Sequence, residues 1–282
     1  MKKYLLSAFL IITSTHIFAQ SPNYRNSLSK NNLYIYWGWN WSSYSNSDIH
    51  FKGNTYNLRL SDVKAQDRPT PFDAKTYFHP LHITNPQYNV RVGYFFKDRL
   101  DISFGVDHMK YVVDQNQKVV INGFINETGS VYDGTYNNEL VVIEPGFLQL
   151  EHTDGLNYVN LEFRKHTQLL KYKKIELNGQ IGAGLGGYMP KTDASLLNFE
   201  RNDDWHWAGF GTHVVAGLNL TFFQKLFLQS ELKGGFINLP NIKTTASKSD
   251  VAKQKILFSQ INILFGGIIK ISKDNKTKKL EE

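Results

Sequence analysis

The stretch LYIYWGWNWS, residues 33–42, sets the expected fold class of this 282-residue chain. Its odd-numbered positions hold Leu, Ile and three Trp, whereas its even-numbered positions hold Tyr, Gly, Asn and Ser. Successive side chains of a β-strand point to opposite faces of the sheet. The stretch therefore predicts a strand with one apolar, aromatic face and one face of smaller or more polar side chains.

The same alternation recurs in seven further segments, at 88–96, 100–107, 159–164, 175–185, 208–220, 226–236 and 257–271. Short connections near 97–99, 166–173 and 223–225 alternate with long ones at 44–86, 113–155, 190–205 and 239–255. This layout predicts an all-β fold, an eight-stranded antiparallel up-and-down transmembrane β-barrel with short periplasmic turns and long extracellular loops. The first two long loops contain alternating segments of their own, which we expect to form hairpins above the membrane.

The polar face of the predicted strands favours a membrane barrel over the alternative, a water-soluble sandwich or lipocalin-like barrel. That face is rich in Gly and amides and carries charges in mid-strand, which suits a narrow lumen where opposite charges pair. We expect a polar network in the lumen, formed by Arg91, Asp101, Glu162, Glu176, Glu231 and Lys233. Aromatic residues make up 14% of the chain, and we expect six of them at the lipid headgroups, namely Trp37, Trp39, Trp41, Tyr88, Tyr94 and Phe96.

The N-terminus has the order of a secretory signal peptide. Lys2 and Lys3 precede an apolar stretch at 4–12, and Ala19 ends the segment. We expect a signal peptide at 1–19, a periplasmic linker at 20–32, the barrel at 33–271 and a charged tail at 272–282. The chain has no cysteine, so an exported form must be held by strand pairing and packing rather than by disulfides. The expected location is the outer membrane of a Gram-negative bacterium.

In architecture the chain resembles the small eight-stranded outer-membrane barrels, the OmpA-type transmembrane domain and its relatives. The last segment, Gly266-Gly267-Ile268-Ile269-Lys270-Ile271, is similar to the signal by which such barrels are recognised for assembly. Family members commonly end on an aromatic residue, whereas this chain continues to Glu282. The resemblance implies three partners: the barrel assembly machinery, outer-membrane lipid and lipopolysaccharide.

Motifs for chemistry are sparse. Four residues near the expected outer rim are candidates for catalysis, namely His108, His152, Asp154 and His206, but they lack an identifiable nucleophile or oxyanion site. His79 and His82 lack further metal ligands nearby, so we expect neither a metal nor a cofactor. The net charge of +7 comes from basic residues spread along the chain, and we expect no nucleic-acid partner.

The sequence leaves three functions open. The first is a non-enzymatic barrel that presents its long loops to an unknown extracellular ligand, for binding, adhesion or envelope integrity. The second is an enzyme that modifies lipid A in the outer leaflet, as a deacylase or acyltransferase. The third is a narrow, porin-like channel for small solutes.

Overall fold

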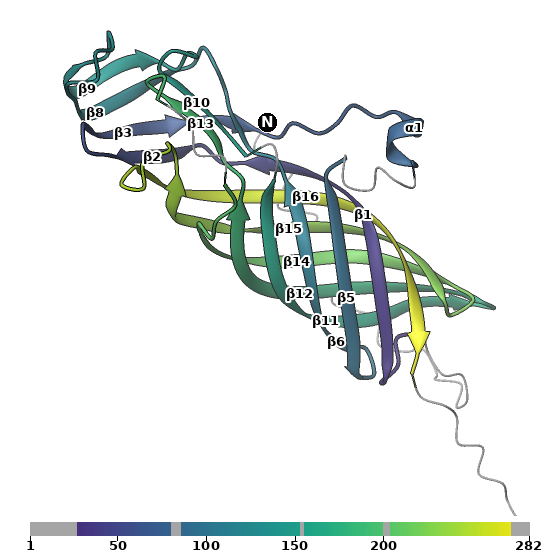
Figure 1. Cartoon of the computed structure of the whole chain (residues 1–282). Coiled ribbons are helices and arrows are strands. Elements are labelled where there is room, and N and C mark those ends of the chain that lie inside the picture. The colour runs from purple at the N-terminus through teal and green to yellow at the C-terminus, as the bar shows by residue number, and fades with distance from the viewer. Residues whose placement is uncertain (1–26, 80–85, 153–154, 200–203, 272–282) are drawn as a thin grey trace, which may run out of the picture.

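A computed structural model describes residues 27–79, 86–152, 155–199 and 204–271. Eight strands form the barrel wall, each hydrogen-bonded to its sequence neighbour in the wall (Figure 1). They are β1 (Asn32–Tyr44), β5 (Tyr88–Lys97), β6 (Leu100–Met109), β11 (Leu156–Tyr172), β12 (Ile175–Pro190), β14 (Gly209–Phe222), β15 (Leu226–Lys243) and β16 (Val251–Lys270). The first and last strands pair along their length, from Asn32 opposite Lys270 to Tyr44 opposite Phe258. The sheet is therefore closed, and the predicted eight-stranded antiparallel fold is confirmed.

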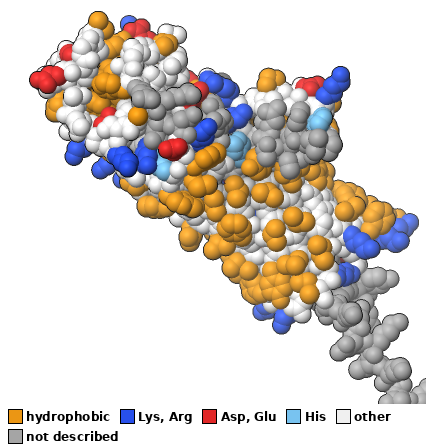
Figure 2. Space-filling view, viewed as in Figure 1, with side chains coloured by type: hydrophobic (Ala, Val, Ile, Leu, Met, Phe, Trp, Pro, Cys, Tyr) orange, Lys and Arg blue, Asp and Glu red, His pale blue; other side chains and the backbone are white. Residues whose placement is uncertain are grey.

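The barrel wall is apolar on the outside, as the sequence predicts. Each of the eight strands has an outward aliphatic side chain that is about half exposed or more; Ile35 and Val92 are 48% exposed, and Leu185 and Val214 are 65% exposed. Figure 2 shows these side chains as a hydrophobic band over the barrel, with Lys and Arg towards its two ends. So large a bare apolar surface is unfavourable in water, and the inside of the wall is polar. This arrangement defines a lipid-facing wall.

The long loops fold into a second unit at one end of the barrel (Figure 1). Strand β16 has 20 residues, or about 66 Å of strand, roughly twice what a membrane crossing needs. Its upper end pairs with β2 (Ser47–Lys52), and the sheet continues through β3 (Tyr56–Val63) and β8 (Lys118–Ile125) to β9 (Gly134–Val142). The hairpins expected in the first two loops are therefore present. A smaller sheet contains β4 (Ala65–Gln66), β7 (Val112–Val113), β10 (Leu148–Glu151) and β13 (Asp193–Leu196).

A hydrophobic core joins the two sheets, and we call this unit the sandwich. Ile49, Phe51 and Leu58 from the large sheet belong to the same buried cluster as Leu148 and Leu196 from the small one. This cluster makes the sandwich a packed structure rather than a set of loose loops. The expected barrel region 33–271 thus contains a second folded unit that the sequence did not predict.

The apolar face of β16 changes sides where the barrel meets the sandwich. In the barrel, Gln260 points inward and Ile261 points outward; in the sandwich, Ile256 points inward and Lys255 points outward. An apolar side chain must face lipid within the membrane but must face the protein core in water. The change between Lys255 and Leu257 therefore marks the level of the outer membrane surface.

A short segment of the first loop covers part of the outer wall. Helix α1 (Ala74–Tyr77) is capped by Asp73, whose carboxylate accepts a hydrogen bond from the Thr76 amide. The rings of Tyr77 and Phe78 lie 5.2 and 5.3 Å from that of Trp39, and Trp39 is only 6% exposed. The α1 segment therefore covers Trp39, and its expected place among the interfacial aromatics stays a prediction.

Within the part of the chain that the structure describes, no helix is long and apolar enough to cross a membrane.

The segment before β1 closes the lower mouth of the barrel. The side chain of Leu28 is buried with Tyr34, Phe95 and Ile268, and the Arg99 amide donates a hydrogen bond to the Leu28 carbonyl. Residues 27–31 of the predicted linker are thus part of the barrel base. The predicted signal peptide and the tail at 272–282 lie outside the described residues.

Candidate functional site

The barrel lumen is filled by a charged network centred on Glu162. The Glu162 carboxylate forms ion pairs with Arg91 Nη2 at 2.8 Å, Arg164 Nη2 at 2.5 Å and Lys233 Nζ at 2.9 Å. His213 Nε2 lies 2.8 Å from the same carboxylate. Glu162 itself is 1% exposed. Three cations therefore converge on one buried carboxylate, and further anions are needed to balance them.

Two further carboxylates complete the charge balance. Glu231 pairs with Arg164 Nη1 and accepts a hydrogen bond from Asn262 Nδ2 at 3.0 Å. Asp107 accepts a hydrogen bond from Lys233 Nζ at 2.6 Å. The hydroxyl group of Tyr36 lies 2.9 Å from Arg91 Nε and 3.1 Å from Arg164 Nη2. The three cations Arg91, Arg164 and Lys233 thus face the three carboxylates of Asp107, Glu162 and Glu231, and all six side chains are buried. Such pairing offsets the large cost of taking each charge out of water.

The six lumen residues expected from the sequence do not all meet. Arg91, Glu162, Glu231 and Lys233 belong to the central network. Asp101 instead lies closer to the periplasmic turns, where it pairs with His166 Nε2 at 2.6 Å. Glu176 is lower still, bonded to Lys171 Nζ at 2.9 Å and to the Ser27 hydroxyl at 2.5 Å. The sequence interpretation missed Asp107 and Arg164 as network members, although both occupy inward positions of their strands.

Apolar layers close the lumen above and below the charged network. The lower layer consists of Leu28, Tyr34, Tyr36, Phe95, Phe227, Leu264 and Ile268. In the upper layer the rings of Tyr158 and Tyr188 stack with centroids 4.5 Å apart, and both belong to the sandwich core. A hollow of about 10 Å³ remains beside Arg164 and His166, room for about one water molecule. The residues that the structure describes thus leave a plugged barrel.

His108 lies on the outer side of β6, as its position in the strand predicts. Its ring stacks on that of Tyr88 with centroids 5.0 Å apart, and its Nδ1 lies 2.8 Å from Asn157 Oδ1. An amide and a phenol ring thus position the imidazole on the outer wall.

His152 and His206 belong to the sandwich. His152 is fully buried, with Nδ1 3.1 Å from Thr192 Oγ1. Burial, with a smaller contribution from nearby His206, lowers the pKa of His152 to about 3. Burial also lowers the pKa of His206, whose ring contacts the backbone of Asn241 and Lys243. The buried His152 is out of reach of a substrate, which argues against its being catalytic. The fourth candidate, Asp154, lies outside the described residues.

The other expected interfacial aromatics lie on the outer wall, with Trp37 in the middle of β1 and the others nearer to the ends of their strands. Trp37, Trp41, Tyr88 and Tyr94 are partly exposed, and Phe96 is 37% exposed. Tyr94 also donates its hydroxyl proton to Asn31 Oδ1 at 2.9 Å. Phe95 lies between Tyr94 and Phe96 and points into the lumen, because it continues the inward positions of β5 that Asn89 and Arg91 occupy.

No protein-family model matches the chain, and no curated protein is significantly similar to it. Among solved structures, the outer membrane protein OprG from Pseudomonas aeruginosa is 12% identical with a TM-score of 0.42, over 87% of this chain and 99% of that one. The outer membrane protein AlkL is 10% identical with a TM-score of 0.41, over 92% and 98%. Neisserial surface protein A is 8% identical with a TM-score of 0.36, over 83% and 96%. These similarities transfer no function.

The strand pairing and the two faces of the wall define the class of protein. A closed eight-stranded sheet with an apolar exterior and a charged, plugged interior is the architecture of a small outer-membrane β-barrel.

Proposed function

We propose that this protein is a non-enzymatic outer-membrane barrel that holds the sandwich at the cell surface as a binding module. One observation carries the proposal: the long loops form a unit with its own hydrophobic core, continuous with the top of the barrel. Loops much longer than a connection needs usually serve a function. A packed core gives such loops a fixed surface, and rigid surfaces bind with a smaller loss of entropy.

The β8–β9 hairpin at the free edge of the large sheet is the proposed contact surface. Leu140 is 70% exposed and Val131 is 92% exposed, and Phe124 and Val142 add apolar area nearby. Strand β9 ends the order of strands in its sheet, so one of its edges is available for hydrogen bonding. An exposed sheet edge with apolar side chains is a common mode of protein recognition.

The other two functions have less support from the geometry. A channel needs a water-filled path, whereas the charged network and two apolar layers fill the described lumen. A lipid A-modifying enzyme needs a nucleophile beside a base at the outer leaflet. The contacts of His108 instead include Tyr88 and Asn157.

An adhesion assay tests the proposal. Cells that produce the protein should be retained on a panel of immobilised matrix proteins and glycans more than cells that lack it. A variant with Val131→Ser and Leu140→Ser should lose that retention, whereas Lys173→Ser with Lys174→Ser, at a periplasmic turn, should keep it. Equal retention of all four strains, together with a changed lipid A mass spectrum, would support the enzyme instead.

A further inference from the structure

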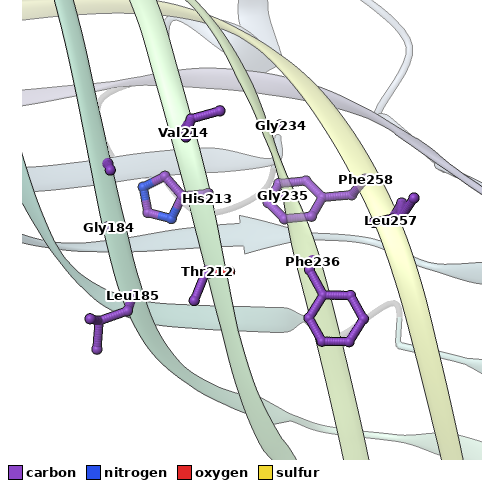
Figure 3. Close-up of a pocket in the computed structure, with 11 residues that line it drawn as sticks. Gly184, Leu185, Thr212, His213, Val214, Gly234, Gly235, Phe236, Leu257 and Phe258 are labelled. Carbon is purple, nitrogen blue, oxygen red and sulfur yellow. The ribbon is translucent and has the colours of Figure 1, made fainter.

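A hollow in the outer wall lies just below the level at which the sandwich begins. It has a volume of about 740 Å³ and is lined by residues from β12, β14, β15 and β16. Figure 3 shows Leu185, Phe236 and Leu257 around the hollow, with Gly234 on β15. A Cβ atom built on Gly234 would meet only the Phe258 carbonyl oxygen, at 3.7 Å. The missing side chain of Gly234 therefore leaves open space on the lipid side of the wall.

Strand register explains why the wall is hollow at this point. Gly234 pairs with Val214 on one side and Ser259 on the other, so small residues adjoin across β15 and β16. In the row above, Phe236 pairs with Leu257; in the row below, Leu232 pairs with Ile261. Large apolar side chains thus border the small ones above and below. On the inner side, His213 and Phe258 fill the space behind Gly235, so the hollow opens towards lipid.

Lysines stand directly above the hollow on the same face of β16. Lys255 is two residues from Leu257 and Lys253 is four, which places them about 7 and 13 Å further along the strand. Both lysines are exposed. Two more lysines lie further along the sheet, because Val251 pairs with Lys243 on β15 and with Lys52 on β2. Asp48 is a nearby acid on this sheet, and its carboxylate already pairs with Arg59 Nη2 at 2.5 Å. The net charge of this face is positive.

Neighbouring aromatic residues place these lysines at the headgroup level. Phe210 pairs with Asn238, which in turn pairs with Lys255. Phe210 is 55% exposed and Trp207 is 59% exposed, and such rings are typical of the membrane interface. Along one face of the protein, the order from the membrane outward is therefore an apolar hollow and then a level that aromatic rings share with the first lysine, Lys255.

We propose that this face binds a phosphate-bearing lipid of the outer leaflet, with an acyl chain in the hollow and the phosphate between Lys253 and Lys255. The hollow faces the hydrocarbon region, so its occupant is a lipid chain. Lysines held at the headgroup level select a lipid with negative charge. The site is separate from the β8–β9 hairpin and does not depend on the binding role proposed for the sandwich.

Native mass spectrometry of the full-length mature protein in detergent tests this site. The probes are phosphatidylglycerol and phosphatidylcholine with identical acyl chains. We expect phosphatidylglycerol to bind about thirtyfold more tightly, since each lysine near an anionic headgroup contributes about fivefold. Lys253→Gln with Lys255→Gln should reduce phosphatidylglycerol binding to the level of phosphatidylcholine. The matched variant Lys173→Gln with Lys174→Gln removes the same charge at the opposite end and should retain the preference.

A second pair of variants tests the hollow. Gly234→Leu fills it and should weaken the binding of both lipids, whereas Ala216→Leu adds the same side chain to the neighbouring wall and should weaken neither. Heat-modifiable migration on gels verifies that each variant is folded. Equal binding of the two lipids to the unaltered protein would overturn the proposal, as would a loss of preference in the Lys173/Lys174 variant equal to that in the Lys253/Lys255 variant. Unchanged binding in a folded Gly234→Leu variant would overturn the role of the hollow.

Discussion

Replacing Glu162 by Gln tests the charged network directly. The change keeps the size of the side chain and removes the negative charge on which Arg91, Arg164 and Lys233 converge. Three buried cations then share the two carboxylates of Asp107 and Glu231. Breaking a buried ion pair from one side typically costs about 3–5 kcal/mol, because a charge is left in a poorly solvated site. Glu162 lies at the centre of the network, so we expect a loss in that range.

Urea unfolding of the protein in lipid vesicles, followed by tryptophan fluorescence, measures this loss. Glu139→Gln is the matched control, because Glu139 is an exposed carboxylate on β9. This substitution should change the free energy of unfolding by less than about 0.5 kcal/mol. A loss below about 1 kcal/mol in Glu162→Gln would refute the view that the network is a tightly coupled structural plug. A loss of the same size in both variants would refute it equally.

Three further predictions follow from particular residues. Gly38→Leu should prevent barrel closure, because a Cβ atom there would lie 2.1 Å from the Ile263 carbonyl oxygen across the β1–β16 seam. The control is Gly146→Leu, at a site with open space. A heat-modifiable band in Gly38→Leu like that of the control would contradict this prediction. The folded sandwich disfavours protonation of His152, whereas the unfolded chain takes up that proton below about pH 6.5, so stability should fall as pH drops from about 6.5 towards 3. The loss should reach about 3 kcal/mol at pH 4.5, and a His152→Gln variant whose unfolding keeps the same pH dependence would show that another group is responsible. In planar bilayers the folded protein should conduct no ions, and discrete channel openings would show that the lumen opens.

The barrel was predictable because its alternation is regular and its environment is uniform. Along β1, β6 and β14 every second side chain lies on the outer face of the wall, so a period of two in residues 33–42 or 100–107 identifies both the strand and its faces. Register shifts are harder to foresee. The pairing of β5 with β6 shifts between Tyr94 and Lys97, and nothing in the run of aromatic residues at 94–96 indicates where the shift falls.

The sandwich was not predictable as a unit because its core comes from distant segments. Ile49, Ile121, Leu148 and Leu196 meet in one cluster, and each alone is only an apolar residue in a polar loop. One local signal was available. The sequence Lys253-Gln254-Lys255-Ile256 reverses the apolar face of β16, which indicates a strand that leaves the membrane and continues in water.

The lumen network was predictable only in part, for a similar reason. Inward positions reveal which charges face the lumen, but the pairing depends on strand stagger. Stagger brings Arg91 of β5 to Glu162 of β11, while it leaves Asp101 with His166 lower in the barrel.

The orientation of the barrel is the central claim, and cysteine labelling on intact cells tests it most directly. The chain has no cysteine of its own, so a single introduced thiol reports one site. Val131→Cys places a thiol in the β8–β9 hairpin of the sandwich, and Lys174→Cys places one in the short turn between β11 and β12. A membrane-impermeant maleimide should label Val131→Cys on intact cells and should label Lys174→Cys only after the outer membrane is opened. Labelling in the reverse order, or recovery of both variants in the soluble fraction, would contradict a barrel that holds its sandwich outside the cell.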